Sequence, residues 1–318
     1  MKKILYYLTS HIKEDFNLKT YCYFVVFLAI FTSLNYYYDF ESQILDKFFG
    51  TTLGIPTHMA FYYFAYFGIA IPQAFFNRKT YRLKEKEFWI KTLIFVGLIG
   101  LVDGFHYYRA WISFHGISSI EQRYLYKVAG EFKRVAIFTI PLLLTYKYFD
   151  SKDKNIYGFN ISKTENKFDH KPYIVMLLIM IPLIASASFG SSFIKAYPRF
   201  KPWLYLAIFD LPQYVTAAIF EVVYGLDFIF VEWIYRGALI IGLAKIMGKD
   251  AILPMVSTYA FLHFGKPLGE TIGSIFGGYI LGVIALQTKN ITGGIYIHMG
   301  VAYLMEFFAY LQHFLFSK

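Results

Sequence analysis

Charged side chains are scarce in this chain, and cysteine is almost absent. Only 16% of the 318 residues are charged and 57% are hydrophobic, whereas about a quarter of the residues of a soluble domain carry charge. The composition therefore excludes an ordinary soluble domain and favours a multi-pass membrane protein. Cys22 is the single cysteine, which excludes a disulfide within the chain and a thiolate metal site.

The basic residues do not gather into a surface suited to nucleic acid. The formal net charge is +10, but the Lys and Arg residues lie in short loops between apolar segments. Anionic lipid headgroups and the excess of Lys and Arg in cytoplasmic loops explain such a distribution. We therefore expect the lipid bilayer, and no nucleic acid, as a partner.

The first residues also lack the small-residue cleavage site of a removable signal peptide. The start, MKKILYYLTSHIKEDFNLK, has a basic beginning, but His11 and Lys13 interrupt the apolar run that follows. We expect the first span to act as an uncleaved anchor.

Apolar runs of about 20 residues, the length that crosses a bilayer, fill most of the sequence. Spans are expected near 21–38, 57–76, 88–106, 134–149 and 173–194, twice within 203–247, and near 251–264, 271–287 and 292–316. Because 134–149 and 251–264 are short, the predicted count is eight or nine. The predicted fold is all-α, a polytopic transmembrane helical bundle.

A polar stretch divides the sequence into two membrane parts. Residues 151–172 are rich in Lys, Asn and Asp and too short for a domain, so we interpret them as a loop. This predicts Tyr- and Phe-rich transmembrane helices over 1–150 and a second transmembrane domain over 173–318. The loops at 77–91 and 147–171 carry many Lys and Arg residues, which predicts that they and the N-terminus face the cytoplasm.

Four glycines recur within one apolar segment of the second part. Gly273, Gly277, Gly278 and Gly282 form two overlapping GxxxG spacings. Such spacing favours close helix packing; the oligomeric state is not readable from it.

Ionisable side chains inside apolar segments are costly and often functional. Glu232 and Arg236 are four residues apart and share one helical face. A buried structural ion pair is one interpretation. Two histidines in later apolar segments, His263 and His298, suggest another, because one carboxylate and two imidazoles are able to activate a water molecule.

The surroundings of the two histidines supply secondary candidates. Tyr259 lies one helical turn before His263, and Glu270 follows it within two turns. Glu306 follows His298 by two turns, on a neighbouring face of the helix. A lone histidine in such a place is more often a packing residue, so the functional interpretation depends on all of these residues together.

The fragments VEWIYRG, YAFLH and HMGVA resemble, in order and spacing, the three motifs of the CPBP intramembrane protease family. That family is also called Abi or CAAX-protease-like, and its motifs read EExxxR, FxxxH and HxxxN or HxxxD. The resemblance covers about residues 173–316 and is closest in character to bacterial members. It implies an integral protein of the bacterial inner (cytoplasmic) membrane that hydrolyses a peptide or protein substrate.

The resemblance also implies roles for the candidate residues. Glu232 would be the base that activates water, Arg236 would orient it, and His263 and His298 would polarise the carbonyl or hold the water. Val231 stands where the family has the first Glu, and Ala302 where it has Asn or Asp. Either Glu232 has taken over the role of base, with Glu270 or Glu306 supplying polarity, or the scaffold binds peptide without turnover.

Two further alternatives remain open at the level of sequence. Glu232, His263 and His298 would be sufficient as the three protein ligands of a catalytic zinc, although the same residues work without a metal. Polar groups inside apolar helices are also typical of small-solute transporters. HExxH is absent, which argues against a zinc protease of that helix type.

Overall fold

The structure is a computed structural model and describes residues 1–114, 116–160, 169–205 and 208–316. The α-helices are α1 (Lys2–Asp15), α2 (Leu18–Tyr38), α3 (Gly54–Phe76), α4 (Lys86–Gly104), α5 (Tyr107–Phe114), α6 (Ser119–Thr145), α7 (Lys171–Ala187), α8 (Ser191–Ala196), α9 (Gln213–Glu232), α10 (Ala244–Met247), α11 (Ile252–Phe261), α12 (Leu268–Thr288) and α13 (Thr292–Phe316). The π-helices are η1 (Glu41–Leu45), η4 (Tyr146–Asp150) and η6 (Trp233–Gly242). Short 3₁₀ turns are η2 (Asp46–Phe48), η3 (Thr80–Lys84), η5 (Pro202–Leu204) and η7 (Gly248–Ala251), and the strands β1 (Asn155–Ile156) and β2 (Phe159–Asn160) form one antiparallel hairpin.

The predicted all-α membrane bundle is confirmed, but the count of eight or nine spans is not. Six helices among the described residues are long and apolar enough to cross a membrane, and together with the composition they identify an integral membrane protein. The stretch predicted to hold two spans contains one continuous helix, 213–242. The segments predicted at 173–194 and 251–264 contain helices of only 17 and 10 residues.

The chain divides into two compact units, and three of the five divisions fall inside continuous helices, namely α6, α9 with η6, and α13. The first unit comprises Met1–Phe105, Ile137–Lys167 and Glu232–Gly294, and the second comprises His106–Ala136, Phe168–Val231 and Ile295–Lys318. The domain boundaries at 150 and 173 stay a prediction.

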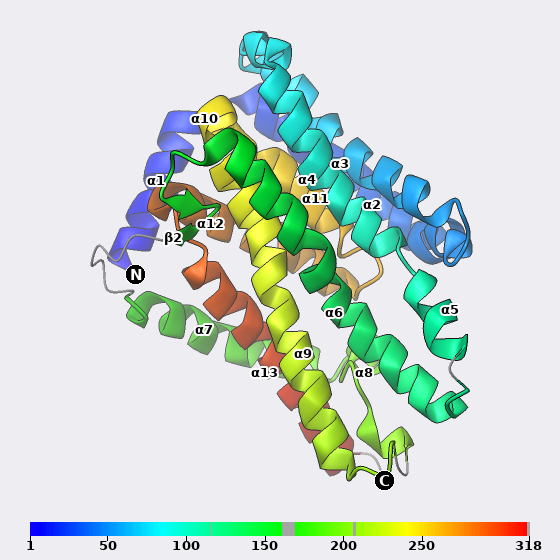
Figure 1. The fold of residues 1–318 in the computed structure, drawn as a ribbon. Helices are drawn as coiled ribbons and strands as arrows, with labels where there is room; N and C mark the ends of the chain where they lie inside the picture. The colour runs from blue at the N-terminus through cyan, green and yellow to red at the C-terminus, as the bar shows by residue number, and fades with distance from the viewer. Residues whose placement is uncertain (115, 161–168, 206–207, 317–318) are drawn as a thin grey trace. The chain divides into compact units, whose positions relative to one another are not determined.

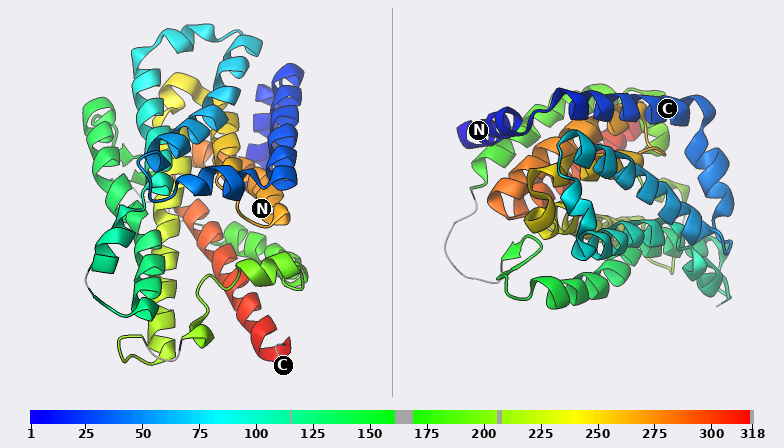
Figure 2. Two further views of the ribbon diagram at one scale, coloured as in Figure 1. Left: turned by 90° about the vertical axis from the view of Figure 1, so that its right-hand side faces the viewer. Right: turned by 90° about the horizontal axis from the view of Figure 1, so that it is seen from above.

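Within the first unit, α3 and α4 lie side by side (Figures 1 and 2). Glycines allow their backbones to approach: a Cβ atom at Gly100 would overlap the Met59 backbone, and one at Gly104 would lie 2.6 Å from the Gly54 carbonyl oxygen. Helix α11 packs against both α3 and α12. Its ten residues are all buried, which explains how a helix too short to cross a membrane forms part of the core.

Close helix packing was predicted at the four glycines of α12, and the structure shows it at Gly278 and Gly282. A Cβ atom at Gly278 would lie 3.2 Å from the Tyr259 ring, and one at Gly282 would lie 3.0 Å from Ile240 and Met255. At Gly273 and Gly277, by contrast, no described atom of a neighbouring element comes within 4 Å. Only two of the four glycines are therefore required for packing among the described residues.

The basic loop after α3 meets the end of α1 at the turn η7. The buried carboxylate of Asp250 pairs with Lys79 at 2.8 Å and with Arg82. The next residue back, Lys249, pairs with Glu14 of α1. These contacts place the N-terminal helix beside the basic loop, as the sequence predicts; the cytoplasmic orientation of both stays a prediction.

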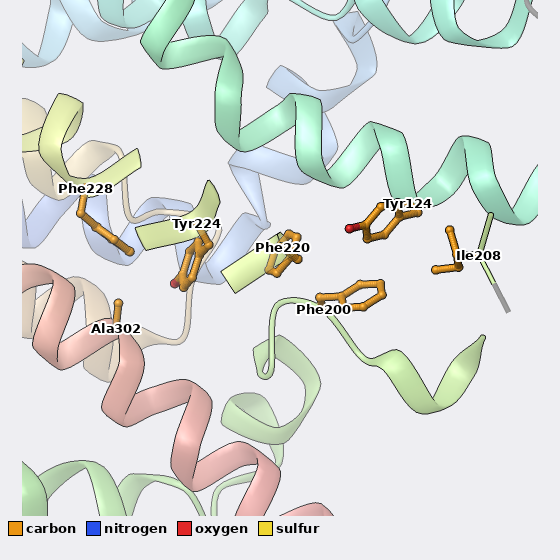
Figure 3. Packing of buried hydrophobic residues seen from close by; sticks show 7 residues of the cluster. All are labelled: Tyr124, Phe200, Ile208, Phe220, Tyr224, Phe228 and Ala302. Atoms are coloured by element: carbon orange, nitrogen blue, oxygen red, sulfur yellow. The ribbon is translucent and has the colours of Figure 1, made fainter. Parts of the chain in front are cut away.

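Aromatic side chains form the core of the second unit (Figure 3). Three of them, Phe220, Tyr224 and Phe228, recur at helical spacing on α9. The remaining members of this cluster are Tyr124, Phe200, Ile208 and Ala302. Ala302 on α13 thus serves as a packing residue, close to the Tyr224 and Phe228 side of the cluster.

Candidate functional site

The predicted pair Glu232 and Arg236 lies at the junction of α9 with the π-helix η6. Both side chains are buried, and Arg236 Nη1 donates to Glu232 Oε1 at 2.8 Å. A π-helix is wider than an α-helix, is rare overall and is frequent at functional sites, and η6 begins at the residue that follows Glu232. The ion pair therefore occurs at a point where the backbone departs from regular α-helical geometry.

Arg236 extends from Glu232 toward α11. Its guanidinium carbon lies 4.2 Å from the centre of the Tyr259 ring, a cation–π contact. The Tyr235 ring is 5.0 Å from the same Tyr259 ring at a steep angle. Tyr259, a secondary candidate from the sequence, thus connects the ion pair to the second predicted motif.

His263 packs against Tyr259. The ring centres are 4.6 Å apart, and His263 Nδ1 is 2.8 Å from the Tyr259 carbonyl oxygen. Because a carbonyl only accepts, Nδ1 carries a proton and donates this hydrogen bond. The bond fixes the orientation of the His263 ring relative to the end of α11.

Residues of α2 and α12 hold the segment that follows His263. Thr271 Oγ1 donates to the His263 carbonyl at 2.5 Å, and Tyr36 donates to the Lys266 carbonyl at 2.6 Å. Asn35 Nδ2 donates to the Phe264 carbonyl at 3.0 Å. These side chains fix the connection between α11 and α12 by bonding to its backbone carbonyls. Pro267 directly precedes α12, at the end of this segment.

Gly294 is a site residue that the sequence analysis missed. A Cβ atom at this position would overlap Glu232 Oε2, so no larger residue fits while the carboxylate keeps its place. The pair GG at 293–294 is a visible signal in the sequence. Nothing in the sequence, however, indicates that it meets Glu232.

Glu41 is a second ionisable group near His263 that the motifs did not indicate. Its Oε1 would lie 2.6 Å from a Cβ atom at Gly265, two residues after His263. Burial raises the pKa of Glu41 to about 7, and neighbouring carboxylates, that of Asp46 foremost, contribute to this increase.

The other predicted residues have different surroundings. His298 belongs to the second unit, where its ring centre is 4.5 Å from that of Phe228. Glu306, also in the second unit, accepts two hydrogen bonds from the Arg199 backbone N–H, at 2.9 and 3.1 Å. Glu270 pairs with Lys266 at 3.7 Å. The structure therefore brings Glu232, Arg236, Tyr259 and His263 together in the first unit.

We compared the zinc alternative with the grouping of possible metal ligands among the described residues. Across the part of the chain that the structure describes, no three His, Cys, Asp or Glu residues are grouped so that they could hold a metal ion. Glu232 is one of the three ligands in that alternative. Its Oε1 accepts a hydrogen bond from Arg236.

Comparison with known proteins supports the resemblance seen in the motifs. The family model for the type II CAAX prenyl endopeptidase Rce1-like proteins matches residues 211–304. This segment contains all three motifs, so the resemblance to the CPBP family is confirmed over it. No curated protein and no solved structure matches the chain.

Proposed function

We propose that the protein is an intramembrane endopeptidase in which Glu232 activates the attacking water. The observation that carries this proposal is the continuous contact from Glu232 through Arg236 and Tyr259 to His263, inside a segment similar to CAAX prenyl endopeptidases. A buried carboxylate and an imidazole in this arrangement supply a proton acceptor and a polar partner for water.

The proposed reaction is hydrolysis of a peptide bond. Glu232 removes a proton from water, the water oxygen bonds to the carbonyl carbon, and the C–N bond breaks as the proton passes to the departing nitrogen. His263 stabilises the oxyanion or holds the water, the role that the family motifs also imply for His298. Arg236 positions Glu232 through the ion pair. The substrate is a peptide or protein segment at the membrane.

The test combines a residue substitution with isotope labelling. The purified protein is incubated in ¹⁸O-water with two probe sets, prenylated peptides ending in a CAAX sequence and unmodified apolar peptides. Mass spectrometry should find new termini with one ¹⁸O atom in the new carboxylate. Glu232→Gln should reduce this product on the order of a hundredfold or more, because a general base is lost.

A matched substitution shows whether removal of a carboxylate elsewhere in the protein also changes the rate. Glu85→Gln replaces an exposed Glu before α4 and should leave the rate unchanged. Glutamine at 232 still presents an oxygen to Arg236 but leaves the buried guanidinium without its counter-charge, so thermal unfolding must show that the variant is folded before its rate is compared. Full activity of Glu232→Gln would refute the proposal, as would product without ¹⁸O.

A non-catalytic peptide-binding or immunity function is the second candidate. Two positions that are polar in the family motifs hold buried apolar residues here, Val231 and Ala302. Ala302 also belongs to the aromatic cluster of the second unit. Both observations support this second function. A binder should retain peptide affinity and phenotype in Glu232→Gln and release no product in either form.

A further inference from the structure

The turn of the hairpin β1–β2 has two successive residues with positive φ angles. Tyr157 has φ +49° and Gly158 has φ +97°, and they stand between paired residues Ile156 and Phe159. Two successive positive φ angles are the requirement of a tight two-residue hairpin turn, a strained choice for tyrosine. Tyr157 is nevertheless buried, at 2% exposure, so contacts with other elements hold this turn.

One set of contacts joins the hairpin to η6, directly after Glu232. Trp233 Nε1 donates to the Ile156 carbonyl at 3.2 Å, and its ring lies 5.6 Å from that of Phe159. A Cβ atom at Gly237 would overlap the Tyr157 carbonyl oxygen. Trp233 and Gly237 are the residues that directly follow Glu232 and Arg236.

A second set joins the hairpin to the chain before α13. Asn155 Nδ2 donates to the Lys289 carbonyl at 2.6 Å. A Cβ atom at Gly158 would lie 2.5 Å from Ile291. Gly294, which contacts the Glu232 carboxylate, follows three residues after Ile291. The hairpin therefore touches both segments that meet at Glu232.

The hairpin is in turn anchored by a buried ion pair. Tyr157 donates from its hydroxyl to Asp150 Oδ2 at 2.9 Å, and Lys91 Nζ lies 2.8 Å from the same oxygen. Lys91 also donates to the Gly242 carbonyl, at the end of η6, at 3.2 Å. The hairpin and η6 thus share one anchoring group.

We propose that the hairpin 155–160 is a positioning element of the site, which sets the separation between the Glu232–Arg236 pair on η6 and Gly294. Trp233, Gly237 and Tyr157 are the positioning residues. This inference rests on the proposed peptidase function for its kinetic consequence, but the positioning itself is measurable without turnover.

The decisive variant is Gly237→Ala in the full-length protein. Alanine is a better helix former than glycine, so the variant should fold, but its methyl group forces the hairpin away from η6. Gly277→Ala is the matched control, since no described atom of another element lies within 4 Å of that site. Trp233→Phe gives a second perturbation, which removes the N–H donor and keeps an aromatic ring.

The readout independent of turnover is labelling of Glu232 by dicyclohexylcarbodiimide, an apolar reagent for buried carboxyl groups. Mass spectrometry follows the rate at Glu232, with Glu306 of the second unit as internal reference. We expect labelling of Glu232 to become several-fold faster in Gly237→Ala and Trp233→Phe and to stay unchanged in Gly277→Ala. Thermal unfolding verifies that each variant is folded.

The kinetic test uses a peptide that the wild type cleaves. In Gly237→Ala, kcat should fall on the order of tenfold to a hundredfold while KM stays nearly unchanged, because a small displacement of a catalytic group lowers the rate by factors of this size. Unchanged Glu232 labelling in both folded variants would overturn the inference. Altered labelling in a protein whose wild type cleaves neither probe set would uphold the positioning role and overturn only the peptidase proposal.

Discussion

Lys91 carries its charge at a position where the side chain is fully buried. Its ammonium lies 2.7 Å from Glu87 Oε1 and 2.8 Å from Asp150 Oδ2. A buried ion pair often adds little net stability compared with an apolar replacement of both partners, but removal of one partner leaves an uncompensated charge. The interaction is therefore best tested by single substitutions.

We expect Lys91→Met to destabilise the protein by about 3–5 kcal/mol, because the Asp150 carboxylate stays buried without its main counter-charge. Unfolding by heat or denaturant in detergent measures the loss. Lys86→Met, which replaces an exposed residue at the start of α4, is the control. Equal stability of the two variants would contradict the prediction.

The sequence predicted the local contacts of the site and missed the long-range ones. Glu232 with Arg236, and Tyr259 with His263, are each four residues apart, so helical periodicity alone brings each pair together. Gly294 and Glu41 reach the site from distant segments, and periodicity holds no information about such contacts. The roles of all these residues in catalysis stay a proposal.

At the scale of elements, some glycines of α12 pack closely against neighbouring elements and others do not. Gly282 faces Ile240 and Met255, whereas Gly277 has no described atom of another element within 4 Å. Gly282→Ala should push α12 away from η6 and α11 and lower the unfolding temperature. Gly277→Ala should leave it equal or raise it, because alanine favours a helix by about 0.5–1 kcal/mol. Equal shifts in the two variants would show that the packing at Gly282 is loose.

The hairpin and the π-helix are the elements that the sequence analysis did not predict. The hexapeptide NIYGFN has a two-residue Tyr-Gly turn between apolar residues, a weak hairpin signal inside a stretch that we interpreted as a loop. For η6, composition gives no signal, since a π-helix uses the same apolar residues as an α-helix. The continuous helix 213–242 was divided in the prediction because its apolar run exceeds one bilayer thickness.

For the whole molecule, acidity should affect stability through Glu41. Its pKa is raised to about 7 in the folded protein, by burial first and then by neighbouring carboxylates, against about 4.3 in an unfolded chain. A raised carboxyl pKa contributes stability that is present at low pH, where the group is protonated in the folded protein, and is lost as pH rises from the unfolded pKa through the folded pKa.

We therefore expect this group to reduce the stability of the wild type between about pH 4 and 7, and Glu41→Gln to lose less, since its amide does not ionise. Unfolding temperatures of both proteins across this range give the measurement. Glu85→Gln, which removes an exposed carboxylate, is the matched control and should follow the wild-type profile. Identical pH profiles for wild type and Glu41→Gln would contradict the expectation.

The anchor of the hairpin has a consequence for how the protein is made. Synthesis proceeds from the N-terminus, so the ribosome completes α4, with Lys91 in it, well before Asp150 exists. During that interval Glu87, one turn away at 2.7 Å in the finished protein, is the nearest acid to neutralise the lysine. The hairpin therefore gains its ion-pair anchor only once Asp150 has been made, and until then Lys91 depends on a partner within its own helix.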